Sequence, residues 1–305
     1  MIDLMSLEFE LYEEKRRKMR RFSFLKGIIT TLIVVTIIVA FWNRGLVSYP
    51  HIAMYQVYGE IYDNPERDDI LNKIAVDEDV YGLILKINSP GGTVVGAEAL
   101  YESLIKISNK KIVVVSIGEV GASAAYLAAL AGDKIFARGN SLVGSIGVIV
   151  QYPDLSKLAE FLGVSMQVVK SGEVKGGINF LEPLNKNVIE NQELLVNDSF
   201  IWFKELVSQR RGLKGKELEK VSNGQLFTGR MALELGLIDE IGSSEQVLKY
   251  FRNQGQKFKE IKVIDWSLQQ TSNSVWNTIF GFDNPLSGSN KIKLMQSPML
   301  FSIAG

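Results

Sequence analysis

The sequence contains no cysteine and only one histidine, His51. The absence of cysteine excludes a thiol nucleophile, a thiolate metal site and any disulfide. A serine–histidine–aspartate triad would have to use His51, because no other histidine exists. His51 lies next to the first expected strand and shortly after a long apolar run, so we expect a surface or packing residue there rather than a general base.

The sequence also lacks an excess of either charge sign, since it contains 34 basic and 34 acidic residues and its formal net charge is zero. No basic field argues for binding to nucleic acid, and we expect no nucleic-acid partner. With 305 residues, 46% of them hydrophobic, the chain is long enough to bury one sizeable core or two modest ones.

A basic cluster and a long uncharged run stand out near the N-terminus. Residues 1–26 end in a series of lysines and arginines, and residues 27–43 carry no charge and are largely apolar. A run of this kind is typical of a short transmembrane helix, and Trp42 lies where an interfacial aromatic is expected. The alternatives are a buried core helix and a cleavable signal peptide, although the exit lacks a small-x-small cleavage site.

We therefore expect residues 1–26 to form a cytoplasmic basic segment and residues 27–43 to form a retained membrane anchor. The positive charges that precede the anchor would keep the N-terminus in the cytoplasm. The rest of the chain would then lie outside the membrane, in a periplasm or an extracellular space.

Strands and helices alternate in the body of the chain. Residues 80–88 and 112–117 are apolar and β-branched, as in buried strands, and between them one apolar helix face is expected at Ala97, Leu100 and Leu104. Such units imply parallel pairing with right-handed crossovers, so we predict an α/β domain over residues 50–255, then a C-terminal strand and tail over 256–305. Further strands are expected at 52–61, 134–137, 140–148, 166–169 and 261–266, and helices at 155–162, 187–211 and 245–250.

Ser123 lies where the strand at 112–117 gives way to an alanine-rich segment that favours a helix. A serine at such a junction has its hydroxyl beside free backbone N–H groups, which suits a nucleophile that must stabilise an oxyanion. The alternative is that Ser123 only caps the helix while the alanines allow close packing.

Two further segments follow expected strands. Gly91 and Gly92 follow residues 80–88, with Ser89 and Pro90 between. Because the carboxyl ends of parallel strands meet at one edge, this loop should lie near Ser123. No Gly-Lys-Ser/Thr follows, so the glycines are not a phosphate loop, and a plain turn is the alternative. Lys170 and Lys175 flank small residues after the strand expected at 166–169; either is a candidate base or a solvated surface lysine.

Taken together, five motifs resemble the signal peptide peptidase A family of membrane-anchored serine proteases, relatives of the ClpP/crotonase fold. The resemblance covers roughly residues 52–255. Its carriers are residues 87–92, 121–126, 142–148, 170–175 and 227–230 with 232–242. The resemblance implies repeated β-β-α units on a mainly parallel sheet, together with one N-terminal transmembrane helix.

The same resemblance implies the site. Ser123 would be the nucleophile, Lys175 the general base, and Gly92, with Gly91, would supply the oxyanion hole; no metal and no cofactor are implied. The pKa of a lysine is ordinarily near 10.4, so only about one lysine in 2,500 is neutral at pH 7, and a base of this kind needs a lowered pKa.

The partners implied are peptide substrates, in particular cleaved signal peptides, the membrane, and further copies of the chain in a ring-like homo-oligomer whose sites combine the serine and lysine of neighbouring subunits. The location implied is a bacterial cell membrane. Two other functions stay open. One is a non-catalytic, membrane-anchored oligomeric scaffold, and the other is a crotonase-type acyl-CoA enzyme that uses the Gly-Gly amides to hold an enolate.

Overall fold

The computed structural model describes all residues except 1–3, 44–48, 184, 268–300 and 304–305. The chain forms two compact units, Met1–Tyr49 and Pro50–Gly305. The second unit carries every residue expected in the site.

The first unit is a single helix, α1 (Leu4–Asn43), which continues without a break from the basic cluster into the apolar run. In the part of the chain that the structure describes, none of the helices combines the length and the apolar character needed to cross a membrane. The expected transmembrane anchor over residues 27–43, and the single-pass placement that depends on it, are therefore not supported.

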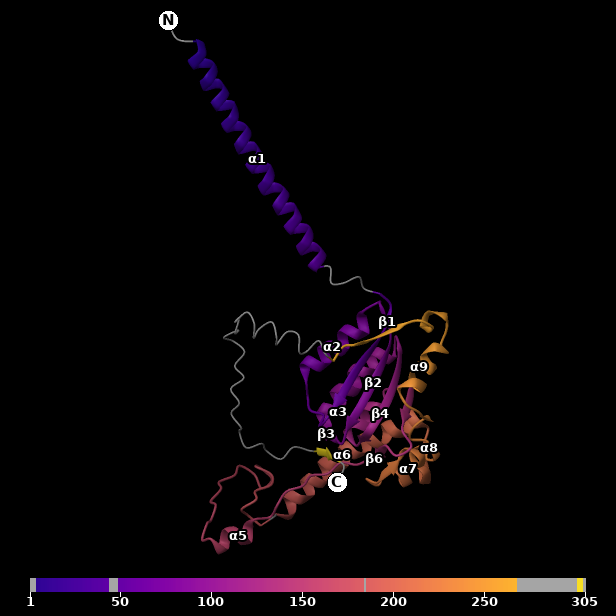
Figure 1. Ribbon diagram of the computed structural model, residues 1–305. Coiled ribbons are helices and arrows are strands. Elements are labelled where there is room, and N and C mark those ends of the chain that lie inside the picture. Colours follow the sequence, from indigo (N-terminus) through magenta and orange to yellow (C-terminus); the bar gives the residue numbers. More distant parts are fainter. Residues whose placement is uncertain (1–3, 44–48, 184, 268–300, 304–305) are drawn as a thin grey trace. The chain divides into compact units, whose positions relative to one another are not determined.

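The second unit is built on an eight-stranded sheet with the order β7-β6-β4-β2-β1-β9, in which β5 pairs with β4 and β8 (Figure 1). Every strand pair in this sheet is parallel except β6 with β7, which confirms the expected α/β class with a mainly parallel sheet. The strands are β1 (His51–Tyr58), β2 (Val80–Ser89), β4 (Ile112–Ala122), β5 (Lys134–Ala137), β6 (Leu142–Gly144), β7 (Leu226–Thr228), β8 (Glu240–Ile241) and β9 (Lys262–Asp265).

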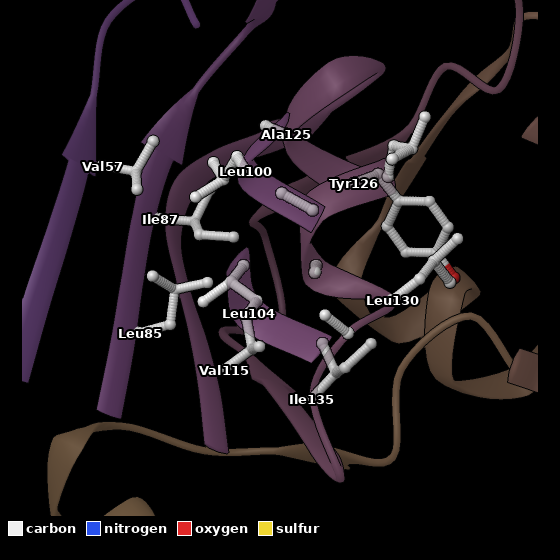
Figure 2. Close-up of a cluster of buried hydrophobic side chains, with 14 of the residues drawn as sticks. Val57, Leu85, Ile87, Leu100, Leu104, Val115, Ala125, Tyr126, Leu130 and Ile135 are labelled. Atoms are coloured by element: carbon white, nitrogen blue, oxygen red, sulfur yellow. The ribbon is translucent and has the colours of Figure 1, made fainter. Parts of the chain in front are cut away.

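One face of the sheet is covered by α2 (Pro65–Val76), α3 (Val94–Ser108) and α4 (Ala124–Ala129). The expected apolar face of α3 is confirmed, because Ala97, Leu100 and Leu104 are fully buried. Figure 2 shows the side chains of this core gathered together: Leu85, Ile87 and Val115 from the strands, Leu100 and Leu104 from α3, and Ala125 and Tyr126 from α4.

The opposite face carries a smaller core. Successive side chains of a strand point to opposite faces, so Ile84, Val114 and Phe136 point away from α3 and pack against Val247 and Phe251 of α9 (Ser244–Arg252). A capping box formed by Ser243 and Gln246 begins this helix. The α8 helix (Gly229–Glu234) contacts β6, β7 and β8, and α7 (Gly215–Val221) contacts α6.

Between β6 and α6 (Lys186–Arg211) the chain forms an arm, residues 151–183, whose side chains are mostly exposed. Its one helix is α5 (Ser156–Phe161), which Figure 1 shows away from the sheet. The strand expected at residues 166–169 is not formed; Met166, Val168 and Val169 are exposed there and have no neighbouring strand to pair with. The helix expected at 187–211 is confirmed as α6.

The tail expected over residues 256–305 is described in part. A short 3-10 helix, η1 (Gln256–Phe258), leads into β9, which pairs with the free edge of β1. Residues 268–300 lie outside the described residues. The described part then ends in β10 (Phe301–Ile303), which pairs antiparallel with β3 (Gly91–Thr93).

Candidate active site

Ser123 holds a backbone conformation that few residues other than glycine adopt. Its φ is 54° and its ψ is −121°, at the sharp turn between β4 and α4. Only one other non-glycine residue among those described, Ser145, has a positive φ. Strain of this kind persists where the surrounding structure enforces it, and a serine on a strained strand-to-helix turn is the geometry of a nucleophile elbow.

The side chain of Ser123 is fully buried, yet its Oγ has no hydrogen-bond partner among the described residues. It makes no bond to the backbone N–H groups of α4, so the expected alternative of a helix cap is wrong. A buried hydroxyl without a partner costs about 1–3 kcal/mol. The hydroxyl is thus held out of the local hydrogen-bond network.

The Gly91–Gly92 loop lies beside this turn. Ser89, at the end of β2, is the parallel partner of Gly121 on β4, and β3 contacts α4 directly. A Cβ on Gly92 would come within 2.0 Å of the Ile61 carbonyl oxygen, so only glycine fits there. The Gly91 N–H donates to Ser89 Oγ at 3.2 Å, so of the two glycines expected in an oxyanion hole, Gly91 already has a hydrogen-bond acceptor for its N–H.

The β3 edge beside Ser123 accepts an extended strand. Ser302 of β10 lies opposite Gly92, with Phe301 opposite Thr93 and Ile303 opposite Gly91, in antiparallel register. Addition of a strand to a free edge is one of the ways in which proteins bind extended peptides. The sequence did not show that the chain's own C-terminal residues could take this place.

Ser145 is a buried serine for which the sequence suggested no role. Its φ of 49° is strained, and its N–H donates to the Gln225 carbonyl at 2.8 Å. The preceding carbonyl, that of Gly144, accepts the Ser123 N–H at 2.8 Å. The strained serines therefore lie on adjoining segments, and the β6 end helps to hold the Ser123 turn.

Two contacts hold α4 behind Ser123. The hydroxyl of Tyr126 donates to the Leu237 carbonyl at 2.7 Å, and burial raises the pKa of this phenol well above its ordinary value. At the other end of α4, Arg210 from α6 donates to the carbonyls of Leu130, Ala131 and Gly132. These carbonyls follow the last helical turn, where few intrahelical partners remain.

The lysines expected as bases do not reach Ser123 within one chain. Lys175 lies on the exposed arm, where its backbone N–H donates to the Gly172 carbonyl, and its amine is not bonded to Ser123 Oγ. Lys170 forms an ion pair with Glu182 at 3.5 Å. The chain by itself thus brings together Ser123 and the glycine loop, but not the base.

His51 is a packing residue, as expected. Its ring stacks on Trp266 with centroids 5.9 Å apart, and Trp266 Nε1 donates to His51 Nε2 at 3.0 Å. His51 begins β1, whereas Ser123 follows the carboxyl end of β4. Because these strands run parallel in one sheet, the two residues lie at opposite ends of it, and a histidine triad with Ser123 is excluded.

Comparison with known proteins decides the family. Residues 105–257, half of the chain, match peptidase family S49, and residues 57–142 match the Clp protease family. The chain belongs to peptidase family S49. Both matched ranges include Ser123, the first includes Lys175 and the second includes Gly92.

Individual proteins that are similar to this chain are also named as proteases. A protease-named protein of Synechocystis is 34% identical over 210 residues, which cover 68% of this chain and 76% of that protein. Protease 4 of Haemophilus influenzae is 30% identical over 230 residues, 72% of this chain. The chloroplastic serine protease SPPA of Arabidopsis thaliana is 26% identical over 213 residues, 67% of this chain. The aligned regions span only 37% and 32% of these last two proteins.

Proposed function

We propose that this peptidase is a serine endopeptidase in which Ser123 is the nucleophile and Lys175 of a neighbouring copy is the general base. The observation that carries the proposal is the state of Ser123: strained, buried, and without a hydrogen-bond partner at the start of α4. A serine in a purely structural position would hydrogen-bond its hydroxyl locally or adopt an ordinary backbone conformation.

The exposed arm supports the participation of a second copy. The arm that carries Lys175 presents a set of large apolar side chains to solvent: Leu158, Phe161, Leu162, Val164, Val168, Val169 and Val174. An apolar surface of this extent usually marks an interface. Docking of the arm on a neighbouring copy would cover these side chains and carry the amine to a Ser123 that has no base of its own.

The interface also provides the chemistry that a lysine base requires. Burial among apolar groups disfavours the ammonium ion and lowers the pKa of a lysine, which yields the neutral amine. As Ser123 Oγ bonds to the peptide carbonyl carbon, its proton passes to Nζ of Lys175. The proton then passes to the leaving amine as the C–N bond breaks.

Hydrolysis of the acyl-enzyme follows the reverse route. A water molecule gives a proton to Lys175 and bonds to the acyl carbon, and Ser123 leaves with that proton restored. The Gly92 N–H, and the free N–H groups at the start of α4, stabilise the oxyanion in both steps.

The β3 edge gives the substrate its place. An extended peptide can pair with Gly91–Thr93 as β10 does, which sets its carbonyls beside Gly92 and Ser123. Cleaved signal peptides are the substrate that we propose, because an apolar peptide freed from its protein can become extended along such an edge.

Fluorophosphonate labelling of the full chain tests this proposal. We expect the wild-type protein to label, and labelling to be lost in Ser123→Ala and in Lys175→Ala. Lys157→Ala, on the same arm, is the matched control and should label normally. Loss in Ser123→Ala alone would keep the nucleophile and reject Lys175 as the base. A wild-type protein that assembles but does not label would reject the peptidase mechanism and favour a scaffold.

A further inference from the structure

A cavity of about 650 Å³ lies at the carboxyl end of the sheet. It is lined by residues that end or follow β1, β2, β4, β5 and β8, among them Tyr58, Asn88, Val120, Arg138 and Gly242. Ser123, Gly91, Gly92 and Lys175 do not line it. Ligands of parallel sheets bind outside the carboxyl ends of the strands, and the size fits a small molecule.

The charges in this cavity are unbalanced. Lys86, on β2, and Arg138, just after β5, both line it, and neither side chain has an ion pair or hydrogen bond within the described part of the chain. Lys86 is half-buried and extends from the same face of β2 as Ile84. Glu119 is the one carboxylate in the lining, so the cations exceed it by one charge.

Neutral groups add further hydrogen-bond donors. Asn88 Oδ1 accepts the N–H groups of Glu119 and Val120 at 3.2 and 3.1 Å, which fixes the amide with its NH₂ group free to donate. Ser116 and Ser244 add hydroxyls. An acceptor with a single negative charge complements this set. A phosphate dianion would leave an excess negative charge beside Glu119.

Part of the lining is apolar and accessible. Tyr58 and Leu142 are both exposed, and Val120 is half-buried. A ligand that satisfies both parts of the cavity has one carboxylate and an apolar body. We propose that this cavity binds the C-terminal carboxylate of a short apolar peptide, with Lys86 and Arg138 holding the carboxylate oxygens. An arginine can hold a carboxylate through two parallel N–H···O bonds.

This binding does not require Ser123 to be a nucleophile, although short apolar peptides are also what the proposed hydrolysis releases. The test therefore uses the full chain with Ser123→Ala, which cannot cleave the probe. Calorimetry compares N-acetyl-Ala-Leu-Leu as the free acid with the same peptide as its C-terminal amide. We expect the acid to bind at least about 10-fold more tightly, as the loss of a charged hydrogen bond implies.

In the same background, Lys86→Met and Arg138→Met should each weaken binding of the acid about 10-fold and leave the amide unaffected. Lys110→Met and Arg252→Gln, exposed residues outside the cavity, are the controls and should change nothing. If circular dichroism shows that the Lys86→Met variant does not fold, the Arg138→Met variant alone carries the test, because Arg138 is exposed.

Equal affinity for acid and amide, absence of binding, or full affinity in the Arg138→Met variant would each overturn the proposal. Inorganic phosphate that competes as well as the acid would also overturn the carboxylate assignment, and would make the cavity a phosphate site.

Discussion

Ser123 combines two costs that a structural residue would avoid. Its φ of 54° is the kind of strain that costs about 1–3 kcal/mol, and its buried hydroxyl is without a partner. Both costs destabilise the folded state. Substitutions at Ser123 can therefore change the free energy of unfolding separately from the catalytic activity.

Replacement of Ser123 by glycine should give a more stable protein than replacement by alanine, and both replacements should abolish hydrolysis. Glycine adopts a positive φ without steric cost, so Ser123→Gly should exceed Ser123→Ala in unfolding free energy by about 1 kcal/mol. Chemical denaturation of the two variants measures the difference, and both should be inactive against a fluorogenic peptide. An alanine variant as stable as the glycine variant would show that the turn is not strained.

Gly92 should be intolerant of any side chain. In Gly92→Ala the new Cβ would lie 2.0 Å from the Ile61 carbonyl oxygen, so β3 must shift and the oxyanion donor with it. We expect kcat to fall at least about 100-fold, as for the loss of one oxyanion donor. Gly172→Ala is the control for a glycine-to-alanine change as such, because a Cβ at Gly172 meets nothing within 4 Å. This variant should unfold at the same free energy as the wild-type protein.

At the scale of elements, α4 depends on the end of α6. The guanidinium of Arg210 donates to three carbonyls that follow α4, and Arg211 is paired with Asp239 at 3.0 Å. The short α4 helix could not hold Ser123 in place by its own hydrogen bonds, because isolated helices of this length are unstable.

Arg210→Met should therefore destabilise the fold by about 1 kcal/mol, because it removes hydrogen bonds to partly buried carbonyls. The thermal unfolding midpoint measures this loss. Arg252→Met, which removes an exposed arginine from the last turn of α9, should change the midpoint much less. Equal effects in the two variants would show that Arg210 does not secure α4.

The pairing of β10 with β3 predicts competition with substrate. A chain that stops at residue 300 lacks β10 and leaves the Gly91–Thr93 edge free, so its KM for an extended peptide should fall while kcat stays similar. The proline variant Ser302→Pro should act in the same direction, because proline cannot donate to a strand ladder. An unchanged or higher KM in both variants would mean that substrate does not use this edge.

At the scale of the whole molecule, we propose that assembly of neighbouring copies completes the site. Lys175 lies on an apolar, exposed arm, and Ser123 lies buried in the domain without a base. A head-to-tail interface that joins the arm of one copy to the domain of the next forms a closed ring when the rotation between copies closes.

Complementation distinguishes a shared site from one within a chain. Co-expressed Ser123→Ala and Lys175→Ala chains should regain about a quarter of the wild-type activity, since a heterologous interface pairs an intact serine with an intact lysine in about one site in four. Each variant alone should be inactive. A mixture that stays inactive although the chains co-assemble, or an active wild-type monomer, would assign both residues to one chain.

Much of the fold was predictable because it depends on local patterns. The β-branched runs at residues 80–88 and 112–117 and the apolar face with Leu100 and Leu104 became buried strands and a buried helix where expected. The strand predicted at residues 166–169 from the same kind of pattern was wrong, since an apolar run forms a strand only when a neighbouring strand edge is available. The membrane anchor expected over residues 27–43 was not supported either.

The sequence by itself determined the class of the fold, the protease family and the serine at the turn, because each is recognised from short residue patterns and their order along the chain. Only the tertiary structure decided that Ser123 is strained and unpaired, that Gly92 touches Ile61, that His51 packs on Trp266, and that Lys175 lies apart from Ser123 within one chain. These facts depend on contacts between distant segments, and packing rather than local preference sets such contacts.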